Sequence, residues 1–437
     1  MSDYTIYYKQ TDGKVRTYNV MTKEFKSIHY IDLFKIKKRY AMLTGYEAND
    51  KDMIRFAKDF RDWVEEIKDN DIFTFDYLKY SSHESVCVDM FKKLCHGNYE
   101  DMEDIDQIEF EWIESCNNAS LTYCNKGTHQ CYGYDYSSKY PSILATEHFH
   151  IPTKRGKQQT LTELPEYPKV GFYKVLIVSN DNRFNKVWNY NPRQVYTNYS
   201  LAFANKCKKQ GYKVDIHLIQ CENNCYIYGE LDKKDENKTG VIKCSKVFHK
   251  WYDYLFELKQ EFPKNKLVKL MTSSLWGRLA EFNRIFRTED ELEKTKLDFT
   301  LDYDPNHKYY VRNIQYSSKR KTDVYELIES KRPYRFNIAR IKPFLISKSR
   351  AVIGAVAMEY IDDVVRIHTD NVTFNKQHDD VIEKHSTKML KLTKEDKTTG
   401  LMTFNGVSCY RNHTNEKYTT KNYGTIEEDD FDEEFFE

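Results

Sequence analysis

The sequence lacks several features that would place it in common classes of protein. Its 437 residues contain no apolar run close to the roughly 20 residues that cross a membrane. The start, Met1-Ser2-Asp3-Tyr4, has no basic segment followed by an apolar stretch, so we expect no secretory signal. A Walker-type glycine loop is missing, which argues against an ATPase motor. With 31% charged and 40% hydrophobic residues, the chain is predicted to be a soluble cytoplasmic protein of two or three subdomains.

The ten cysteines form no regular metal-binding pattern. Two sets could be considered as zinc ligands, but their spacings are irregular, and Cys-x-x-x-Cys is not the usual Cys-x-x-Cys knuckle. We therefore expect reduced thiols, as in a cytosol-like compartment. The two sets are Cys207, Cys221, Cys225 and Cys244, and Cys116, Cys124 and Cys131.

A net charge of only +1 hides an uneven distribution of charge along the chain. The segment from Glu427 to Glu437 holds eight acidic residues and no basic ones, so the rest of the chain carries a net +9. Such a segment is too charged to fold alone and is predicted to be disordered. Its three phenylalanines suggest a docking motif for a replication partner, and a solvated tail without a partner is the alternative.

Hydrophobic periodicity predicts a mixture of helices and strands. We expect a connector at 117–133 and then a strand that enters a helix over 134–150, with Pro141 in the first helical turn. Strands are predicted at 4–8, 15–20, 170–179, 213–220 and 364–367, with a hairpin region at 401–423. Helices are predicted at 51–68, at 245–287 with a break at Pro263, and at 343–360.

Two aspartates end apolar, strand-like segments far apart in the sequence. Asp135 begins Asp-Tyr-Ser-Ser-Lys-Tyr-Pro-Ser, and Asp370 stands in Ile-His-Thr-Asp-Asn-Val. Carboxylates at strand ends can hold Mg²⁺ together with substrate phosphates, and two such ions clamp the attacking and leaving oxygens in phosphoryl transfer. Either aspartate alone is more simply a residue that caps a turn. The lysine-containing segment 269–277 between them makes a polymerase-type site the better interpretation.

The three segments resemble motifs A, B and C of the B-family DNA polymerases, above all the small protein-primed branch found in phages, linear plasmids and some viruses. The family patterns are Asp-x-x-Ser-Leu-Tyr-Pro-Ser, Lys-x-x-x-Asn-Ser-x-Tyr-Gly and Asp-Thr-Asp-Ser. The resemblance covers roughly residues 117–420. It implies an α+β fold with the right-hand polymerase architecture: a palm with an antiparallel sheet, helical fingers and a small thumb.

The resemblance also implies roles for individual residues. Asp135, the carbonyl of Tyr136 and Asp370 would hold Mg²⁺ or Mn²⁺, and Tyr140 would exclude a ribose 2′-hydroxyl. Lys269 would neutralise triphosphate charge from the fingers helix. The further nucleotide-binding residues would be Ser138, Lys139, Ser274 and Gly277. The DNA contacts would be Trp276, Thr369 and a weak Lys-x-Tyr-like element at Lys417 and Tyr418.

Several positions depart from the family patterns. His368 replaces the first aspartate of motif C, so one negative charge is lost beside Asp370. We expect this to weaken metal binding and to make the enzyme slow or manganese-preferring. Restoring the carboxylate with His368→Asp is expected to raise activity, unless the surroundings have adapted to histidine. The other departures are Lys139 for leucine, Ser273 for asparagine, Trp276 for tyrosine and Asn371 for serine.

The region before motif A is short for this family. Only 134 residues precede Asp135, and they lack the Asp-x-Glu motif of a proofreading exonuclease; the segment Asp71-Ile-Phe-Thr-Phe-Asp76 does not match it. The predicted domains are a reduced or unrelated N-terminal region at 1–116, palm with an inserted subdomain at 117–244, fingers at 245–300, continued palm at 301–385, thumb at 386–424 and an acidic tail at 425–437.

The sequence thus predicts a template-directed DNA polymerase that adds dNTPs to a 3′-hydroxyl in the replication of a viral or plasmid genome. DNA template and primer and dNTPs are the expected partners, and whether a terminal protein supplies the priming hydroxyl is left open. One alternative is a catalytically weak or inactive DNA-binding or replisome scaffold protein derived from a polymerase. Another is a primase-like or terminal nucleotidyl transferase on the same fold.

Overall fold

The computed structural model describes most of the chain, in two compact units that are each described by themselves. The described residues are 4–10, 14–33, 35–36, 38–43, 46–67, 83–95, 102–116, 119–146, 148–230, 232, 240–317, 322–420 and 422–423. The predicted acidic tail and the segment 71–76 lie outside them. Unit 1 comprises 1–107 with 247–339, and unit 2 comprises 108–246 with 340–437. In the described part of the chain, no helix is both long and apolar enough to cross a membrane.

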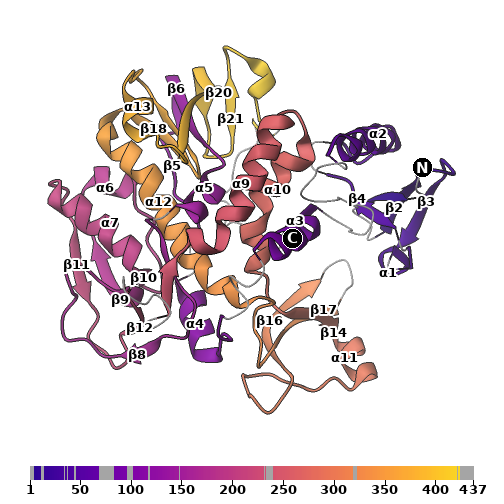
Figure 1. Cartoon of the computed structure of the whole chain (residues 1–437), viewed down its shortest axis with the longest axis horizontal. Coiled ribbons are helices and arrows are strands. Elements are labelled where there is room, and N and C mark those ends of the chain that lie inside the picture. The colour runs from indigo at the N-terminus through magenta and orange to yellow at the C-terminus, as the bar shows by residue number, and fades with distance from the viewer. Residues whose placement is uncertain are drawn as a thin grey trace. The chain divides into compact units, whose positions relative to one another are not determined.

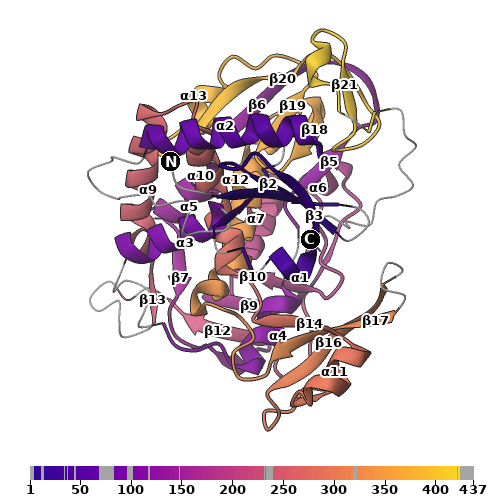
Figure 2. The same cartoon turned by 90° about the vertical axis from the view of Figure 1, so that its right-hand side faces the viewer.

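Unit 1 contains two four-stranded sheets, ordered β3-β2-β1-β4 and β14-β17-β16-β15. Helix α11 packs on the second sheet (Figure 2), and helices α2 and α3 pack on α10. The strands are β1 (Thr5–Lys9), β2 (Lys14–Asn19), β3 (Phe25–His29), β4 (Arg39–Ala41), β14 (Arg284–Thr288), β15 (Phe299–Thr300), β16 (Tyr309–Ser317) and β17 (Thr322–Glu329). The helices are α1 (Tyr30–Leu33), α2 (Asp50–Ile67), α3 (His83–Leu94), α9 (Ser245–Glu261), which begins just before the unit boundary, α10 (Lys266–Leu279), α11 (Glu289–Thr295) and the 3₁₀-helix η2 (Asn337–Ile341), which crosses the boundary.

Unit 2 is built on a six-stranded antiparallel sheet of order β21-β20-β6-β19-β18-β5. Figure 1 shows β6 beside β20, although almost the whole sequence of unit 2 separates them. The strands of this sheet are β5 (Thr122–Cys124), β6 (Gly127–Ser137), β18 (Val364–His368), β19 (Asn371–Phe374), β20 (Lys391–Phe404) and β21 (Tyr410–Asn412).

Helices and a second sheet complete unit 2. The helices are α4 (Gln107–Ser115), α5 (Lys139–Ala145), α6 (Asn182–Lys186), α7 (Asn198–Lys209), α12 (Lys342–Glu359), α13 (Val381–His385), η3 (Ile361–Asp363) and η4 (Glu416–Tyr418). The remaining strands are β7 (His150–Pro152), β8 (Lys157–Gln159), β9 (Val170–Val178), β10 (Val195–Thr197), β11 (Asp215–Leu218), β12 (Cys225–Gly229) and β13 (Val241–Lys243). Strands β8 to β12 form the second sheet, and β7 pairs with β13.

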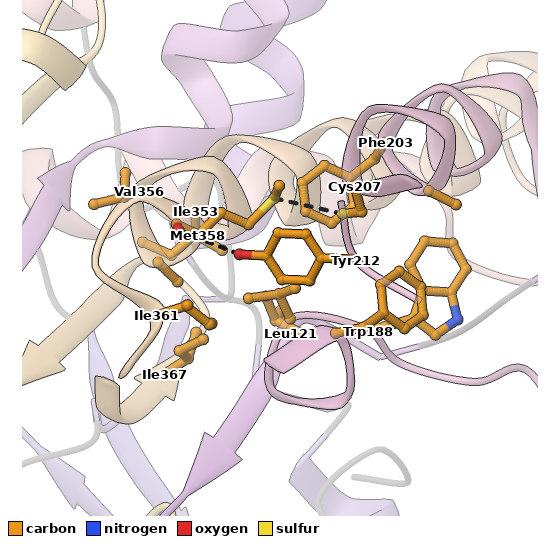
Figure 3. Packing of buried hydrophobic residues seen from close by; sticks show 14 of the residues in the cluster. Leu121, Trp188, Phe203, Cys207, Tyr212, Ile353, Val356, Met358, Ile361 and Ile367 are labelled. Atoms are coloured by element: carbon orange, nitrogen blue, oxygen red, sulfur yellow. Dashed lines mark hydrogen bonds between the residues drawn. The ribbon is translucent and has the colours of Figure 1, made fainter. Parts of the chain in front are cut away.

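The core of unit 2 joins the six-stranded sheet to α7 and α12. In Figure 3, the hydroxyl of Tyr212 donates to the carbonyl of Met358 at 3.2 Å, and the sulfur of Cys207 lies 3.4 Å from that of Met358. Gly354 on α12 is required here, because a Cβ would stand 2.6 Å from the ring of Phe203. Close packing therefore fixes α12 against α7. Helix α12 in turn contacts α5, which begins at Lys139, and β19, which begins directly after Asp370.

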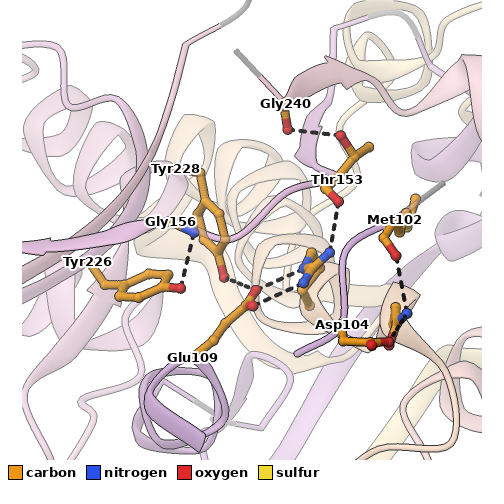
Figure 4. A network of polar contacts seen from close by, with 10 residues as sticks. Met102, Asp104, Glu109, Thr153, Gly156, Tyr226, Tyr228 and Gly240 are labelled. Atoms are coloured by element: carbon orange, nitrogen blue, oxygen red, sulfur yellow. Dashed lines mark hydrogen bonds and ion pairs between the residues drawn. The ribbon is translucent and has the colours of Figure 1, made fainter. Parts of the chain in front are cut away.

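A buried ion pair and its hydrogen bonds connect four segments of unit 2. The Arg340 guanidinium donates to both carboxylate oxygens of Glu109, at 2.8 and 2.9 Å, and both side chains are fully buried (Figure 4). The hydroxyl of Tyr228 also donates to Glu109 at 2.8 Å, and Arg340 reaches the carbonyl of Thr153. Every strong polar group of the pair thus has a partner, as burial of charge requires.

Several predicted elements agree with the structure and others do not. The helices predicted at 51–68 and 343–360 correspond to α2 and α12, and the break at Pro263 separates α9 from α10. The connector predicted at 117–133 is wrong, because it contains β5 and most of β6. The end of the helical segment predicted to 287 is strand β14, and helices α6 and α7 lie between the strands predicted at 170–179 and 213–220.

The two observed units are divided at other positions than the predicted domains, whose assignment to palm, fingers and thumb stays a prediction. Strands β16 and β17, expected in the palm, pair with β14 in unit 1. Strand β20, expected in the thumb, pairs with β6 over most of its length and belongs to the six-stranded sheet. Pairing between strands that are distant in sequence decides both cases, and local periodicity carries no signal for it.

Candidate active site

The structure places Asp135 on strand β6 and Asp370 in the turn that leads into the neighbouring strand β19. Asp135 lies near the end of β6, directly opposite Asn371, the first residue of β19. The backbone N–H of Tyr136 donates to the carbonyl of Asp370 at 3.0 Å. Asp370 therefore directly precedes the residue that pairs with Asp135, and both aspartate side chains are partly exposed.

The two carboxylates influence each other. Burial and, after it, the negative charges of Asp370 and Glu395 raise the pKa of Asp135 to about 7, whereas the charges of Lys139 and Lys397 act in the opposite direction. Neighbouring carboxylates repel one another when all are ionised, and a bound cation would relieve this repulsion. The oxygen donors of Asp135 and Asp370 suit a hard divalent ion.

Asp370 sits in a two-residue hairpin turn between β18 and β19. Thr369, the first turn residue, has a left-handed backbone with φ of 56°, which is costly for a β-branched side chain. Two contacts hold it: its N–H donates to the carbonyl of Leu121 at 3.1 Å, and its own carbonyl accepts a hydrogen bond from the Lys139 ammonium. The turn that carries Asp370 is thus fixed from two sides.

Lys139 is buried, with 1% of its surface exposed. It is the first residue of α5, and Ser138 before it has a left-handed backbone that turns the chain from β6 into the helix. Burial lowers the pKa of Lys139 to about 8, while the charges of Asp370 and Asp135 act in the opposite direction. The sequence predicted only backbone contacts at this position; the ammonium at the base of the site was missed.

His368 is held by a cation. Arg366 donates from its Nη2 to Nδ1 of His368 at 2.9 Å. Since a guanidinium can only donate, Nδ1 accepts and the neutral ring carries its proton on Nε2. Burial, followed by the charge of Arg366, lowers the pKa of His368 to about 4. Arg366 also lies over the rings of Phe404 and Tyr410, with its carbon 5.9 and 5.3 Å from their centroids.

Asn371 links Arg366 to a third carboxylate. Its side-chain oxygen accepts from Arg366 at 3.0 Å, and its amide donates to Glu395 at 3.0 Å and to Thr398 at 3.1 Å. Sequence reasoning missed Glu395 and Arg366 as members of the site. Glu395 stands on β20, and only the pairing of β20 with β6 brings it to Asp135, so no local signal marks it.

Gly133 makes room for this arrangement. A Cβ at Gly133 would lie 2.0 Å from the hydroxyl oxygen of Thr398 on β20, which is too close for any side chain at this position. Thr398 is 1% exposed and accepts from Asn371. Glycine is therefore the residue that lets β20 pack on β6 beside the two aspartates.

Tyr140, the predicted sugar discriminator, follows Lys139 on α5. Its hydroxyl forms a hydrogen bond of 2.8 Å with that of Ser120, and burial raises its pKa. The ammonium of Lys139 lies 5.5 Å from its ring centroid. The phenol is thus tethered at its hydroxyl end.

The predicted motif B residues lie on α10 in unit 1. Asn265 caps this helix by accepting from the N–H groups of Leu267 and Val268. Lys269 is exposed, Ser274 donates to the carbonyl of Leu270, and a Cβ at Gly277 would meet nothing within 4 Å. Trp276 is partly buried. Because α10 belongs to the other unit, the proximity of these residues to the aspartates stays a prediction.

The remaining predicted residues lie on η4 and on β6. Lys417 and Tyr418 form part of η4 after β21, with the Lys417 ammonium 4.6 Å from the Tyr418 ring centroid. The side chain of Tyr136 points into the core and donates to the carbonyl of His385, so only its backbone is available to the site. All ten cysteines are free thiols, and the described ranges hold no group of three or more His, Cys, Asp or Glu placed to bind a metal.

Comparisons with known proteins support the fold. No family model and no curated protein sequence matches the chain. Among solved structures, phi29 DNA polymerase complexed with single-stranded DNA matches with a TM-score of 0.54 and 11% identity, over 84% of this chain and 60% of that one. Phi29 DNA polymerase complexed with primer-template DNA matches with a TM-score of 0.52 and 12% identity, over 84% and 61%.

The chain therefore has a mixed α+β fold similar to that of phi29 DNA polymerase over most of its length. It spans about 60% of the length of the polymerase it matches. At this identity the likeness concerns the fold, and the chemistry must be argued from the residues of this chain.

Proposed function

We propose that the protein is a template-directed DNA polymerase that adds dNTPs to a primer 3′-hydroxyl. The observation that carries the proposal is the pairing of Asp135 with Asn371 and of the Tyr136 N–H with the Asp370 carbonyl, which brings one carboxylate on β6 next to another in the turn before β19. The fold similarity to a polymerase solved with DNA supports it.

Asp135 and Asp370 would hold the divalent cation, Mg²⁺ or Mn²⁺, with the Tyr136 carbonyl as a further oxygen donor. When bound, such an ion neutralises charge on the transferring phosphoryl group and lowers the pKa of the attacking hydroxyl. The primer 3′-hydroxyl gives up its proton to solvent as its oxygen forms a bond to the α-phosphorus of the dNTP, the bond from the α-phosphorus to the α–β bridging oxygen breaks, and pyrophosphate leaves. In this class of reaction positioning and charge supply most of the acceleration.

The other residues of the site have positioning roles in this proposal. Lys139 holds the Thr369 turn, and therefore Asp370, in place. Tyr140 would pack against the sugar, while Ser138, Lys269, Ser274 and Gly277 would meet the nucleotide. Trp276, Thr369, Lys417 and Tyr418 would contact the DNA. A terminal protein that supplies the priming hydroxyl, and a partner for the acidic tail, extend the same proposal.

The second candidate is a DNA-holding scaffold protein that kept the fold without the reaction. The neutral His368 and the buried cations Lys139 and Arg366 favour it, because they reduce the negative charge available to a metal.

Primer extension tests the two candidates. A primer-template with each of the four template bases is offered one dNTP at a time, with Mg²⁺ or Mn²⁺. Incorporation of the complementary dNTP alone supports the polymerase, whereas incorporation without regard to the template indicates a terminal transferase. Tight binding of the duplex with no extension in either metal supports the scaffold.

A further inference from the structure

Lys139 is a charged group placed where a polymerase-type site would receive a cation. Its ammonium donates to the carbonyl of Thr369, the residue directly before Asp370. Burial lowers the pKa of this ammonium to about 8, and the charges of Asp370 and Asp135 act in the opposite direction. The side chain is buried, with 1% of its surface exposed. The sequence resemblance expects a neutral leucine at this position.

The ammonium is held by local structure. Lys139 begins α5, which contacts α12, and the left-handed Ser138 directs the chain into the helix. At the other end, the Thr369 carbonyl that accepts the hydrogen bond is itself fixed through its N–H to Leu121. A charge fixed at both ends keeps its position whether or not a metal is bound.

The neighbouring charges are also unusual for a site that would hold two divalent ions. Asp135, Asp370 and Glu395 supply the negative charge, and Glu395 is already bonded to the Asn371 amide. The buried Arg366 offsets part of that charge. His368 contributes no negative charge, since its ring is neutral when Nδ1 accepts a hydrogen bond from Arg366. Two divalent ions would bring more positive charge than these groups can balance at short range.

We propose that the Lys139 ammonium is a built-in cation of this site, so that Asp135 and Asp370 hold a single divalent ion in the absence of nucleotide. This rests on the proposed function, because it assigns these two aspartates to metal binding. Lys139 supplies fixed positive charge beside both carboxylates and thereby stands in electrostatically for the second ion.

Metal titration of the full chain tests the proposal. Mn²⁺ is added without nucleotide, and free Mn²⁺ is followed by electron paramagnetic resonance to give the affinity and the number of ions bound. The wild type is expected to bind one ion. Lys139→Met, which removes the charge at nearly constant length, is expected to bind the first ion at least about tenfold more tightly and to take up a second.

Lys397→Met is the matched control. Lys397 also lowers the pKa of Asp135, and its removal changes the formal charge equally, but it is exposed to solvent. Screening should limit its effect to less than about threefold. Lys139→Arg keeps the charge and should bind one ion, as the wild type does. Lys139→Leu carries the side chain of the family pattern and gives a second neutral variant should the methionine variant not fold.

Wild-type stoichiometry of two, or unchanged affinity in folded Lys139→Met and Lys139→Leu, would overturn the proposal. Equal effects of Lys139→Met and Lys397→Met would also overturn it, because position would then not matter. If the wild type extends primers but the Lys139 variants bind Mn²⁺ with wild-type affinity, the result contradicts this inference and leaves the proposed function in place. A Lys139-dependent affinity in a protein that never extends a primer contradicts the proposed function and leaves the inference in place.

Discussion

Arg366 donates a hydrogen bond to Nδ1 of His368 at 2.9 Å, two residues before the aspartate of the hairpin turn. The same guanidinium donates to Asn371, which follows that aspartate, and to the carbonyl of Val407. The histidine is thus one member of a hydrogen-bonded group that also holds Asn371 and, through it, Glu395. The surroundings of the site are built for a neutral ring at 368.

This relationship changes the outcome expected for His368→Asp. From the sequence, a restored carboxylate should raise activity in Mg²⁺. In the structure, an aspartate at 368 would lie beside Arg366 and form a buried ion pair with it. The guanidinium would then neutralise the charge of the new carboxylate. We therefore expect primer extension no faster than that of the wild type at any Mg²⁺ concentration. A clear gain in rate at low Mg²⁺ would show that position 368 reaches the metal despite Arg366.

Asp135→Asn should stabilise the metal-free protein above neutral pH. The pKa of Asp135 is raised to about 7 in the folded protein, above its value in the unfolded chain. The folded protein therefore loses stability as the pH rises towards and through 7 and this carboxyl ionises. Allowing for partial exposure, we expect roughly 1–3 kcal/mol of added stability at pH 8. The gain should disappear near pH 4, where the wild-type carboxyl is protonated in the folded protein. Urea unfolding in a chelator at both pH values measures it, and equal stability at pH 8 would contradict the assigned environment.

Tyr140→Ala should admit ribonucleotides if the ring excludes the 2′-hydroxyl. Tyr140→Phe is the matched control, because it keeps the ring and removes only the hydroxyl, with its hydrogen bonds to Ser120 and Ser349. We expect the alanine variant to lose discrimination by at least about tenfold and the phenylalanine variant to lose little. The ratio of kcat/KM for dNTP and rNTP decides this, and an unchanged ratio in Tyr140→Ala would remove the residue from the sugar site.

Gly133→Ala should destabilise unit 2, since its Cβ would enter the space of the Thr398 hydroxyl. Overpacking of this kind costs roughly 1–3 kcal/mol. Adding Thr398→Ala should recover part of the loss in the double variant, although Asn371 then lacks one acceptor. Thermal unfolding of the wild type, the two single variants and the double variant gives the coupling. Strictly additive effects would mean that the two residues do not meet.

The sequence predicted those parts of the fold that local patterns determine. The apolar spacing of α2 and α12 and the run of β18 into its turn are visible in the residues themselves. Strand β6 was partly missed, because its Asn, Gly, Cys and Thr-rich approach lacks strand propensity and is held by β20 and β19 on either side. Pairing partners, and not propensity, make it a strand.

The same limit applies to the site. Asp135 and Asp370 stand out in the sequence because each follows an apolar run, and the structure places Asp135 on β6 and Asp370 in the turn directly before β19, the strand that pairs with β6. Glu395 and Thr398 have no such mark, since they reach the site only through the register of β20. Lys139 was recognised as a departure from the family pattern, but burial of its ammonium against the Thr369 turn depends on tertiary packing. Sequence motifs therefore mark the two aspartates and leave the groups around them unmarked.

Single-nucleotide incorporation by Asp135→Asn and Asp370→Asn tests the central proposal most directly. Each change removes a carboxylate charge and keeps the shape of the side chain. Glu383→Gln on α13, an exposed carboxylate, is the matched control. We predict that both site variants bind primer-template DNA and lose at least about a thousandfold in incorporation rate, whereas Glu383→Gln matches the wild type. Wild-type incorporation by either folded site variant would contradict the assignment of the two aspartates to catalysis.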